Sequence, residues 1–506
     1  MKTSEGAAHA RQATTSVRVG YASSGLPADS RNGRLFGASV IAVGGYAFAL
    51  PLLVGMGLIR TPVGLVLVLL SVYSGGRIAF EIFLGASRWL VLAFFSFTYV
   101  FLALAPLIQL SAGYLPWTIE ATPNVLLSAA LISALGALAF DGGLALAGFV
   151  RSKSSRYGSF GAKDSAEDDA PRTLHPRRML AVLAVFSVAS LALVAQHNGI
   201  LAAFISRAEL HDALCPPGPG DTLAECGLVE ALVRVPPALL AVSALWLSSR
   251  RGPVYWGFLA LAVLSLGITA NPVSAPRFWF GAVAIGILGV TVARIKRGGA
   301  VTWLLLPALL LLLFPNLDFG RYQGSSANLV PRLDPIVEKE DFDSFQQIAN
   351  GVMYVETYGY RDGVQTLSSV LFFVPRNLWQ DKAPPTGTLV TAALGESQNT
   401  NVSAPLWEEA FIDFGPPGVI AILSLLGFLV GRAEQSSRAR EGHNSIGDTI
   451  PLVAGYGLFV LRGSLLAATG LLAFLLLLAF IARLAGGFGT KAPLTRRPVP
   501  NTHGSL

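Results

Sequence analysis

Long apolar runs separated by short polar segments dominate the chain. Most of the runs are long enough for a helix to cross a bilayer, which takes about 17 to 25 residues. The pattern predicts an all-α polytopic integral membrane protein with about 12 transmembrane helices. They are expected at residues 35 to 56, 61 to 80, 89 to 110, 124 to 149, 179 to 196, 236 to 249, 253 to 271, 276 to 293, 301 to 315, 414 to 431, 449 to 466 and 467 to 484.

Three boundaries depend on helix-breaking residues. The run at 236 to 249 opens with Pro236 and Pro237, and the run at 301 to 315 ends at Pro315. Proline is typical of helix ends, so we expect a helix to begin or end at each of these positions. The last two runs are separated only by Arg462 and Gly463.

The polar segments define the remaining organisation. Residues 1 to 34 are predicted to be a disordered cytoplasmic tail without a cleavable signal peptide. Nine spans occupy 35 to 315, a large external loop follows at 316 to 413, three spans occupy 414 to 484, and 485 to 506 form a second cytoplasmic tail. A loop of this length is usually functional, and its aromatic content predicts short helices that lie on the membrane surface.

Composition and charge support this interpretation. Hydrophobic residues make up 53% of the chain and charged residues only 13%, against about 25% in soluble domains, which excludes an ordinary soluble enzyme and a disordered protein. Placing both termini inside puts 26 of the 37 Lys and Arg on the cytoplasmic side, as the positive-inside rule requires. The net charge of +7 is therefore explained by topology rather than by nucleic-acid binding.

Two polar motifs in the external loop can carry chemistry. The first, FFVPRNLWQDKAP, contains Arg376, Trp379 and Lys382. The guanidinium fork and the ammonium charge suit a diphosphate, and the alternative is anchoring at lipid headgroup level. The second, NVSAPLWEEAFIDFGPPG, contains Glu408, Glu409 and Asp413. A carboxylate here can act as a general base, and the alternative is a solvated helix start.

Further charged residues have several interpretations. Arg277 and Arg462 lie at predicted span ends and can converge on an external pocket; the alternatives are a headgroup contact and snorkelling. Asp341 and Asp343 form a DxD pattern that we interpret as a helix cap rather than a nucleotide-metal site. Asp141, the one acid inside a predicted span, is weak support for a proton relay.

The external motifs resemble those of bacterial oligosaccharide repeat-unit polymerases, the Wzy-type polymerases of O-antigen and exopolysaccharide. The matching residues are Val374, Pro375, Arg376, Trp379, Lys382, Glu409, Phe411, Asp413, Phe414 and Gly415, together with Arg277 after an Asn-Pro and Arg462 before Gly463. Two residues depart from the family pattern: Ala383 intervenes before Pro384, and Asp413 stands where the family has Asn.

The resemblance implies a glycosyltransferase that polymerises polyprenyl-diphosphate-linked oligosaccharides on the outer face of the bacterial cell membrane. Arg376 and Glu409 would then be catalytic, with Glu409 assisting the acceptor hydroxyl. Arg277, Trp379, Lys382 and Arg462 would bind substrate, without a metal or another cofactor. A flippase and a chain-length regulator are the implied partners. The alternatives are an O-antigen ligase-like transferase and a flippase or transporter of lipid-linked sugars.

The topology yields a testable prediction. A cysteine placed near Ser368 is expected to react with a membrane-impermeant thiol reagent added outside the cell, because the long loop is predicted to be external. A cysteine near Ser165 is expected to be protected. Labelling of intact cells measures both, and the reverse pattern would invert the proposed orientation.

Overall fold

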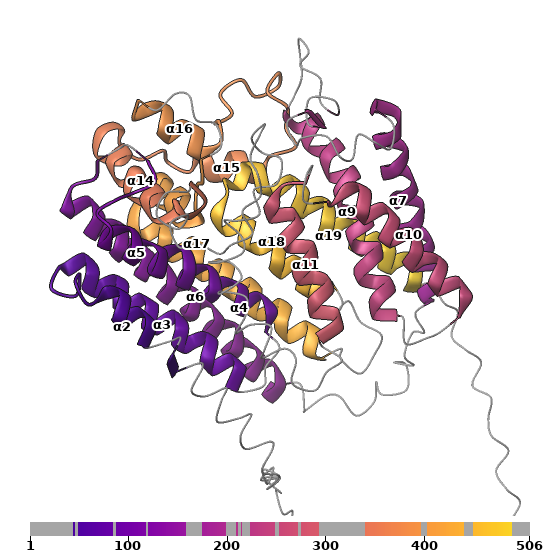
Figure 1. Ribbon diagram of the computed structural model, residues 1–506, viewed down its shortest axis with the longest axis horizontal. Helices are drawn as coiled ribbons and strands as arrows, with labels where there is room; N and C mark the ends of the chain where they lie inside the picture. The colour runs from indigo at the N-terminus through magenta and orange to yellow at the C-terminus, as the bar shows by residue number, and fades with distance from the viewer. Residues whose placement is uncertain are drawn as a thin grey trace, which may run out of the picture. The chain divides into compact units, whose positions relative to one another are not determined.

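The computed structural model describes residues 44–45, 49–83, 88–117, 120–157, 175–198, 209–210, 214, 223–247, 252–271, 275–292, 340–395, 402–439 and 449–487. Within these ranges the regular structure is helical and no strand occurs (Figure 1). The predicted all-α class is therefore confirmed for this part of the chain. The predicted tail at 1 to 34, the apolar run at 301 to 315 and the residues after 487 lie outside it.

Seven helical stretches in the described ranges are long and apolar enough to cross a membrane. Three shorter apolar helices are α10 (Pro253–Thr269), α11 (Arg277–Val292) and α18 (Ile450–Arg462). These helices are those of a membrane protein, while the number of about 12 crossings stays a prediction. The long stretches are α3 (Pro62–Phe83), the continuous series α4 (Trp89–Phe97), η2 (Thr98–Leu104) and α5 (Ala105–Ser111), then α6 (Pro123–Tyr157), α7 (Pro176–Asn198), α9 (Leu223–Leu247), α17 (Leu406–Ala439) and α19 (Leu465–Gly487).

Helix α9 begins earlier than the sequence predicted. It starts at Leu223, and Pro236 and Pro237 lie inside it. Membrane helices tolerate proline because neighbouring helices and local adjustments satisfy the freed backbone groups. The boundary predicted at Pro236 was therefore wrong. Arg234 lies inside the helix and pairs with Glu230, with 2.7 Å between Nη1 and Oε2.

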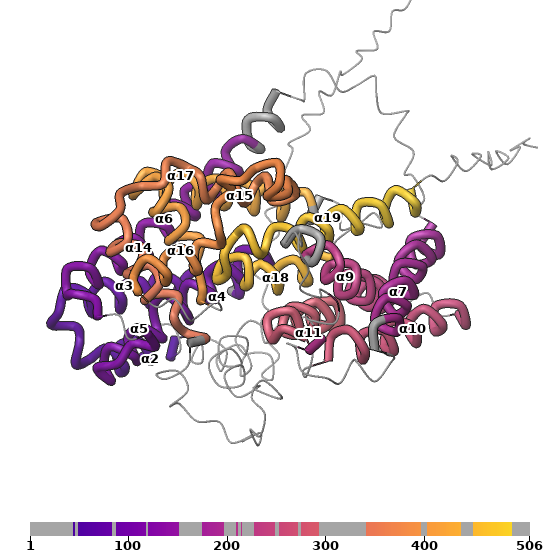
Figure 2. The backbone as a smooth tube through the Cα atoms, turned by 90° about the horizontal axis from the view of Figure 1, so that it is seen from above, coloured from indigo at the N-terminus to yellow at the C-terminus, as the bar shows by residue number. Residues whose placement is uncertain are grey.

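Two hydrophobic cores hold the helices together. The first is formed mainly by α3, α4, η2, α5, α6, α14 (Ser344–Tyr358) and α17, and the second mainly by α7, α9, α10 and α19. Helices α11 and α18 contribute residues to both cores. In both views of the backbone they lie between the two groups of helices (Figures 1 and 2). The C-terminal end of α18 is therefore held by both groups of helices.

The predicted external loop is helical in its described part, and its first long helix is largely buried. The described part of the loop contains η6 (Glu340–Phe342), α14, α15 (Val364–Val370) and α16 (Thr386–Ala393). The short helix α2 (Leu50–Gly55) is not in the loop and packs against the first core. Phe342, Phe345 and Ile348 are fully buried in the first core. Phe342 also stacks on Phe101 of η2, with 5.4 Å between ring centres. Helix α14 is therefore part of the protein core, because its apolar face completes that core. Its place relative to the membrane surface stays a prediction.

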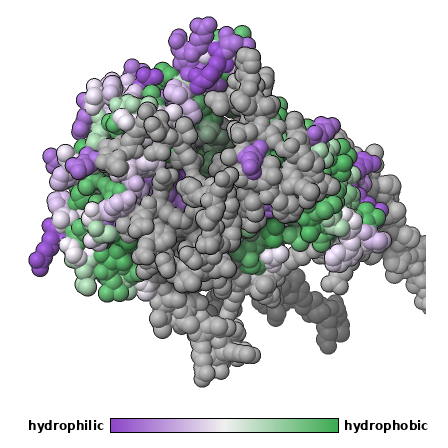
Figure 3. Space-filling model, turned by 45° about the horizontal axis from the view of Figure 1, so that its top comes forward, coloured by the Kyte–Doolittle hydropathy of each residue, from purple (hydrophilic) through white to green (hydrophobic). Residues whose placement is uncertain are grey.

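Apolar side chains also cover the outside of the described helices. Large exposed residues recur along α6 at Leu131, Leu138 and Leu146, and along α19 at Leu477 and Phe480. Hydrophobic surface occupies broad areas of the view in Figure 3. Such surface is expected on helices that contact lipid, because a bilayer imposes no cost for exposing apolar groups.

The charged residues inside α3 and α6 form ion pairs with one another. Asp141 accepts hydrogen bonds from the Tyr73 hydroxyl and from Arg77, the latter at 2.8 Å. The Arg77 guanidinium lies 5.1 Å from the ring centre of Phe95, and Glu81 pairs with Arg88 at 2.8 Å. Asp141 is thus not the one acid within a span, since α3 carries Glu81 as well. Its partners are those of a structural ion pair rather than of a proton relay.

Helices α6 and α17 approach so closely that only glycine fits at several positions. A Cβ atom at Gly143 would lie 2.0 Å from the carbonyl oxygen of Ser424, and one at Gly427 would lie 2.0 Å from that of Phe140. Small residues at helix contacts are the usual means of close packing in membranes. The close approach extends to the first turns of α17, where the candidate site begins, because a Cβ atom at Gly136 would lie 2.0 Å from Nε1 of Trp407.

Gly143→Ala is expected to destabilise the protein, because the added methyl group must separate α6 from α17. Overpacking of this kind costs about 1 to 3 kcal/mol. Gly142→Ala is the matched control, since a Cβ there meets no atom within 4 Å. Thermal unfolding in detergent should show a lower melting temperature for Gly143→Ala only. Equal melting temperatures in the two variants would contradict the close contact.

Candidate functional site

The short connection between α18 and α19, residues 462 to 465, organises the candidate site; we name it the α18–α19 turn. Arg462 ends α18 and Leu465 begins α19, so the predicted separation of the last two runs is confirmed. Arg462 reaches toward the segment that precedes α14, whereas Ser464 and Leu465 reach toward α17. The turn therefore links two sets of charged groups.

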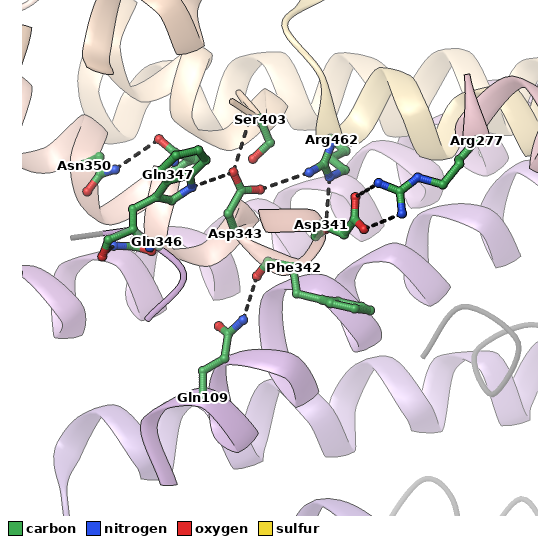
Figure 4. A network of polar contacts seen from close by, with 11 residues as sticks. Gln109, Arg277, Asp341, Phe342, Asp343, Gln346, Gln347, Asn350, Ser403 and Arg462 are labelled. Carbon is green, nitrogen blue, oxygen red and sulfur yellow. Dashed lines mark hydrogen bonds and ion pairs between the residues drawn. The ribbon is translucent and has the colours of Figure 1, made fainter. Parts of the chain in front are cut away.

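Arg277 and Arg462 meet at the Asp341 and Asp343 pair (Figure 4). Arg277 binds both carboxylate oxygens of Asp341, with 2.9 Å from Nη1 to Oδ2 and 3.1 Å from Nη2 to Oδ1. Arg462 donates from Nε to the main-chain oxygen of Asp341 at 3.1 Å, and its Nη2 lies 3.3 Å from Asp343 Oδ1. The Arg462 guanidinium also lies 4.9 Å from the ring centre of Phe278. The two arginines therefore lie close together, as predicted, but at a pair of buried carboxylates. Their position in an external pocket stays a prediction.

Asp343 is fully buried and accepts two further hydrogen bonds. Its Oδ2 accepts from the indole Nε1 of Trp117 at 3.0 Å and from the backbone N–H of Ser403 at 3.3 Å. Although Asp343 directly precedes α14, its side chain makes no capping bond to that helix. The interpretation of the DxD pattern as a helix cap was wrong, because the arginine, the indole and the Ser403 amide engage the carboxylate instead.

The surrounding polar groups fix the segment of Asp341 to Asp343. The main-chain oxygen of Phe342 accepts from Gln109 Nε2 at 3.1 Å, and Gln346 makes two bonds to the main chain of Trp117, at 2.9 and 3.0 Å. Since guanidinium groups occupy the carboxylates of the DxD pattern, the pattern is not arranged as a cation site. In the described ranges no group of three His, Cys, Asp or Glu residues is suited to hold a metal ion.

Glu409 lies on the other side of the α18–α19 turn. Its Oε1 accepts from the Ser464 hydroxyl at 2.8 Å and from the Leu465 N–H at 3.1 Å, and Oε2 accepts from the same N–H at 3.2 Å. A carboxylate at a helix N-terminus is stabilising by about 0.3 to 1 kcal/mol, because it satisfies unpaired N–H groups. The predicted general base is thus engaged in holding the start of α19 against α17.

Asp413 has a similar role toward α15. It accepts the N–H groups of Gln365 at 3.1 Å and Thr366 at 2.7 Å, which are the first orphan donors of that helix. Gly415 follows with φ +65°, and this left-handed conformation produces a kink within α17. Helix α17 begins at Leu406, but the kink falls where the sequence predicted the span to begin, at 414.

Arg376 and Lys382 hold the predicted external loop together through its own backbone. Arg376 donates to the carbonyl oxygens of Lys382 at 2.7 Å and Ala383 at 3.0 Å. The Lys382 ammonium donates to three carbonyl oxygens, those of Leu371, Phe372 and Val374, at 3.3, 2.7 and 2.8 Å. Its three protons are therefore all engaged. Burial lowers the pKa of Lys382, and the nearby Arg376 charge lowers it further.

Among the described residues, Arg376 and Lys382 donate their hydrogen bonds to carbonyl oxygens of their own loop, whereas Arg277 and Arg462 bind Asp341. Trp379 is half-buried in the same loop. Ser368 is buried and accepts a hydrogen bond from the Ala383 N–H, so the topology test belongs on the neighbouring Leu367, which is exposed. Ser165 lies outside the described residues.

Glu408 is the functional candidate that sequence reasoning passed over in favour of Glu409. Its side chain is fully buried, yet neither carboxylate oxygen has a hydrogen-bond partner among the described residues. Burying an ionised carboxylate without a partner costs several kcal/mol, and each such group in a folded protein requires an explanation. The sequence contained a signal for this burial, because apolar residues follow Glu408 three and four positions later, at Phe411 and Ile412. Residues at this spacing share one face of a helix, and both apolar side chains are buried.

Four residues from different parts of the chain contact the segment of Asp341 to Gln346, namely Gln109, Trp117, Arg277 and Arg462. Which end of the helices faces the outside stays a prediction.

Lys382→Met is expected to loosen the loop, because three carbonyl groups lose a charged donor. Each such bond contributes about 1.5 to 3 kcal/mol, so amide exchange across residues 371 to 385 should accelerate at least about tenfold. Hydrogen exchange followed by mass spectrometry measures this, with the exposed Gln380→Met as control. Unchanged exchange in Lys382→Met would instead favour a direct role in substrate binding.

Comparisons of the chain with protein-family models, with curated proteins and with solved structures give no match.

Proposed function

We propose that this protein is a membrane glycosyltransferase that joins polyprenyl-diphosphate-linked oligosaccharide repeat units at the outer face of the bacterial cell membrane. The observation that carries the proposal is the convergence of Arg277 and Arg462 at one buried site beside the start of α17. Two arginines held at fixed positions suit the stabilisation of a diphosphate leaving group, because such donors need no reorganisation when charge develops.

The aspartates orient the arginines in this proposal. Asp341 binds both terminal nitrogens of Arg277, and Asp343 binds Nη2 of Arg462. A diphosphate entering the site replaces carboxylate contacts with contacts to phosphate oxygens, for which the planar guanidinium fork is equally suited. Arg277 and Arg462 are therefore the proposed donors to the leaving group.

The other motif residues support the site from a distance. Arg376 and Lys382 fix the external loop, and Glu409 fixes the α18–α19 turn that carries Arg462. Trp379, half-buried in the same loop, belongs to this framework. In the proposal these residues position the reacting groups, rather than touching the diphosphate or the acceptor hydroxyl as the motifs alone suggested.

The apolar helices support a lipid-linked substrate. Exposed hydrophobic side chains on α6 and α19 give the protein a surface suited to lipid, and the polyprenyl chain of a donor would share that environment. The proposed partners are this lipid-linked oligosaccharide and the bilayer, with a flippase to deliver the substrate and a regulator of chain length. No cofactor is required, because a diphosphate is a good leaving group.

Arg277→Lys tests the proposal, because it keeps the charge but loses the two-pronged geometry. In proteoliposomes supplied with lipid-linked oligosaccharide from the source cell, transfer should slow by at least about 100-fold, while the melting temperature is retained. Arg60→Lys, an exposed arginine in the α2–α3 connection, is the control and should transfer at the wild-type rate. Chain growth is followed as a ladder on a gel.

Two outcomes would replace the proposal. Translocation of the lipid-linked oligosaccharide by the wild-type protein, without chain growth, would indicate a flippase. Transfer of a finished chain to a different acceptor would indicate an O-antigen ligase-like enzyme. A normal ladder from Arg277→Lys would remove that arginine from the reaction.

A further inference from the structure

We propose that the face of α14 opposite the start of α17 binds the acceptor sugar, and that Glu408 accepts the proton of its hydroxyl group. This inference rests on the proposed function for the identity of the acceptor. The site itself is defined by five buried polar side chains with atoms that lack hydrogen-bond partners among the described residues, namely Ser344, Gln347, Asn350, Ser403 and Glu408.

The five side chains lie along two neighbouring segments. Ser344, Gln347 and Asn350 recur every third residue on α14 and so share one face of the helix. Residues 403 to 408 run alongside this part of α14 and contact it at both ends. The Ser403 N–H donates to Asp343, just before the helix, and the Glu408 side chain lies against Gly351, which follows Asn350. The strip is therefore about 10 Å long, at 1.5 Å per helical residue.

Gly351 explains how Glu408 fits against α14. A Cβ atom at this position would lie 2.8 Å from Cγ of Glu408 and 3.5 Å from its Oε1. Because glycine has no side chain, the Glu408 carboxylate lies directly on the helix backbone at Gly351, next to Asn350 in the sequence. Asn350 Nδ2 donates to Gln347 Oε1 at 3.1 Å, which fixes the two amides relative to each other.

The atoms without partners include both donors and acceptors. Gln347 presents Nε2, a donor, while Asn350 Oδ1 and both Glu408 oxygens are acceptors, and the hydroxyls of Ser344 and Ser403 can do either. A sugar hydroxyl both donates and accepts, so a saccharide ring can satisfy such a strip, whereas a phosphate brings acceptors alone. Because the strip is closed to solvent, binding must part α14 from the first turns of α17.

The transfer step balances with these groups. The acceptor hydroxyl oxygen forms a bond to the anomeric carbon of the donor sugar, and the bond from that carbon to the diphosphate oxygen breaks. The diphosphate leaves with the electron pair toward Arg277 and Arg462. The hydroxyl proton passes to a carboxylate oxygen of Glu408. Glu409, whose oxygens are engaged by Ser464 and Leu465, keeps its positioning role.

Binding can be tested without any transfer reaction. The purified protein in nanodiscs is heated with a panel of methyl glycosides, comprising glucoside, galactoside, mannoside, rhamnoside and N-acetylglucosaminide, each at 100 mM. A ligand that binds only the folded state raises the melting temperature, here by about 1 to 2 °C. Sorbitol at the same concentration corrects for general stabilisation by polyols. At least one glycoside should exceed sorbitol.

The variants connect that shift to the strip. Glu408→Gln and Asn350→Ala should lose it, while Glu356→Gln, an exposed acid on the same helix, should retain it. In the transfer assay Glu408→Gln should slow chain growth at least about 100-fold, since general bases contribute about 10² to 10⁴. The proposed site is overturned if no glycoside raises the melting temperature more than sorbitol does. It is also overturned if the rise persists in Glu408→Gln.

The two proposals can fail separately. If the wild-type protein extends the oligosaccharide and Glu408→Gln does so equally fast, the role of Glu408 falls and the glycosyltransferase remains. If the glycoside shift depends on Glu408 but the wild-type protein transfers nothing, the sugar site remains and the proposed reaction falls.

Discussion

A charge buried in a low-dielectric interior must find a partner, and the ion pair of Arg462 with Asp343 is where this constraint shapes the molecule most. It ties the end of α18 to the start of α14, and Asp343 in turn binds Trp117 after α5 and Ser403 before α17. Arg277 adds α11 through Asp341. One small group of charges thus fixes the relative positions of five helices, and removing a single member leaves another charge unpaired.

The same constraint divides the charged residues of the predicted external loop by role. Arg376, Lys382, Glu409 and Asp413 are each engaged by backbone groups or by a hydroxyl, so their charge maintains the shape of the loop and of the α18–α19 turn. Glu408 has no such partner among the described residues. A carboxylate that the fold buries but does not satisfy is the more informative candidate for chemistry, because stability alone gives no reason for it.

Close helix packing makes this burial possible. Glycines let α6 and α17 touch through their backbones, and the Trp407 indole donates to the Ser133 carbonyl at 3.2 Å across the same contact. Phe345 and Ile348 of α14, with Phe342 of the preceding η6, are buried in the same core. Polar residues on the other positions of α14 are carried into the interior with it. A segment that connects two spans in the sequence is therefore part of the core, and its polar face becomes an internal surface rather than an exposed one.

The sequence by itself determined the helical class and most of the helices, because hydrophobic runs of this length have few other stable structures in lipid. It also singled out Arg277, Arg462 and the second acidic motif, since charges at span ends are unusual. It misplaced the start of α9, because the tolerance of Pro236 depends on neighbouring helices. Only the tertiary structure paired the arginines with Asp341 and Asp343 and distinguished Glu408 from Glu409. Adjacent residues point in directions about 100° apart on a helix, so what each one meets is decided by elements distant in the sequence.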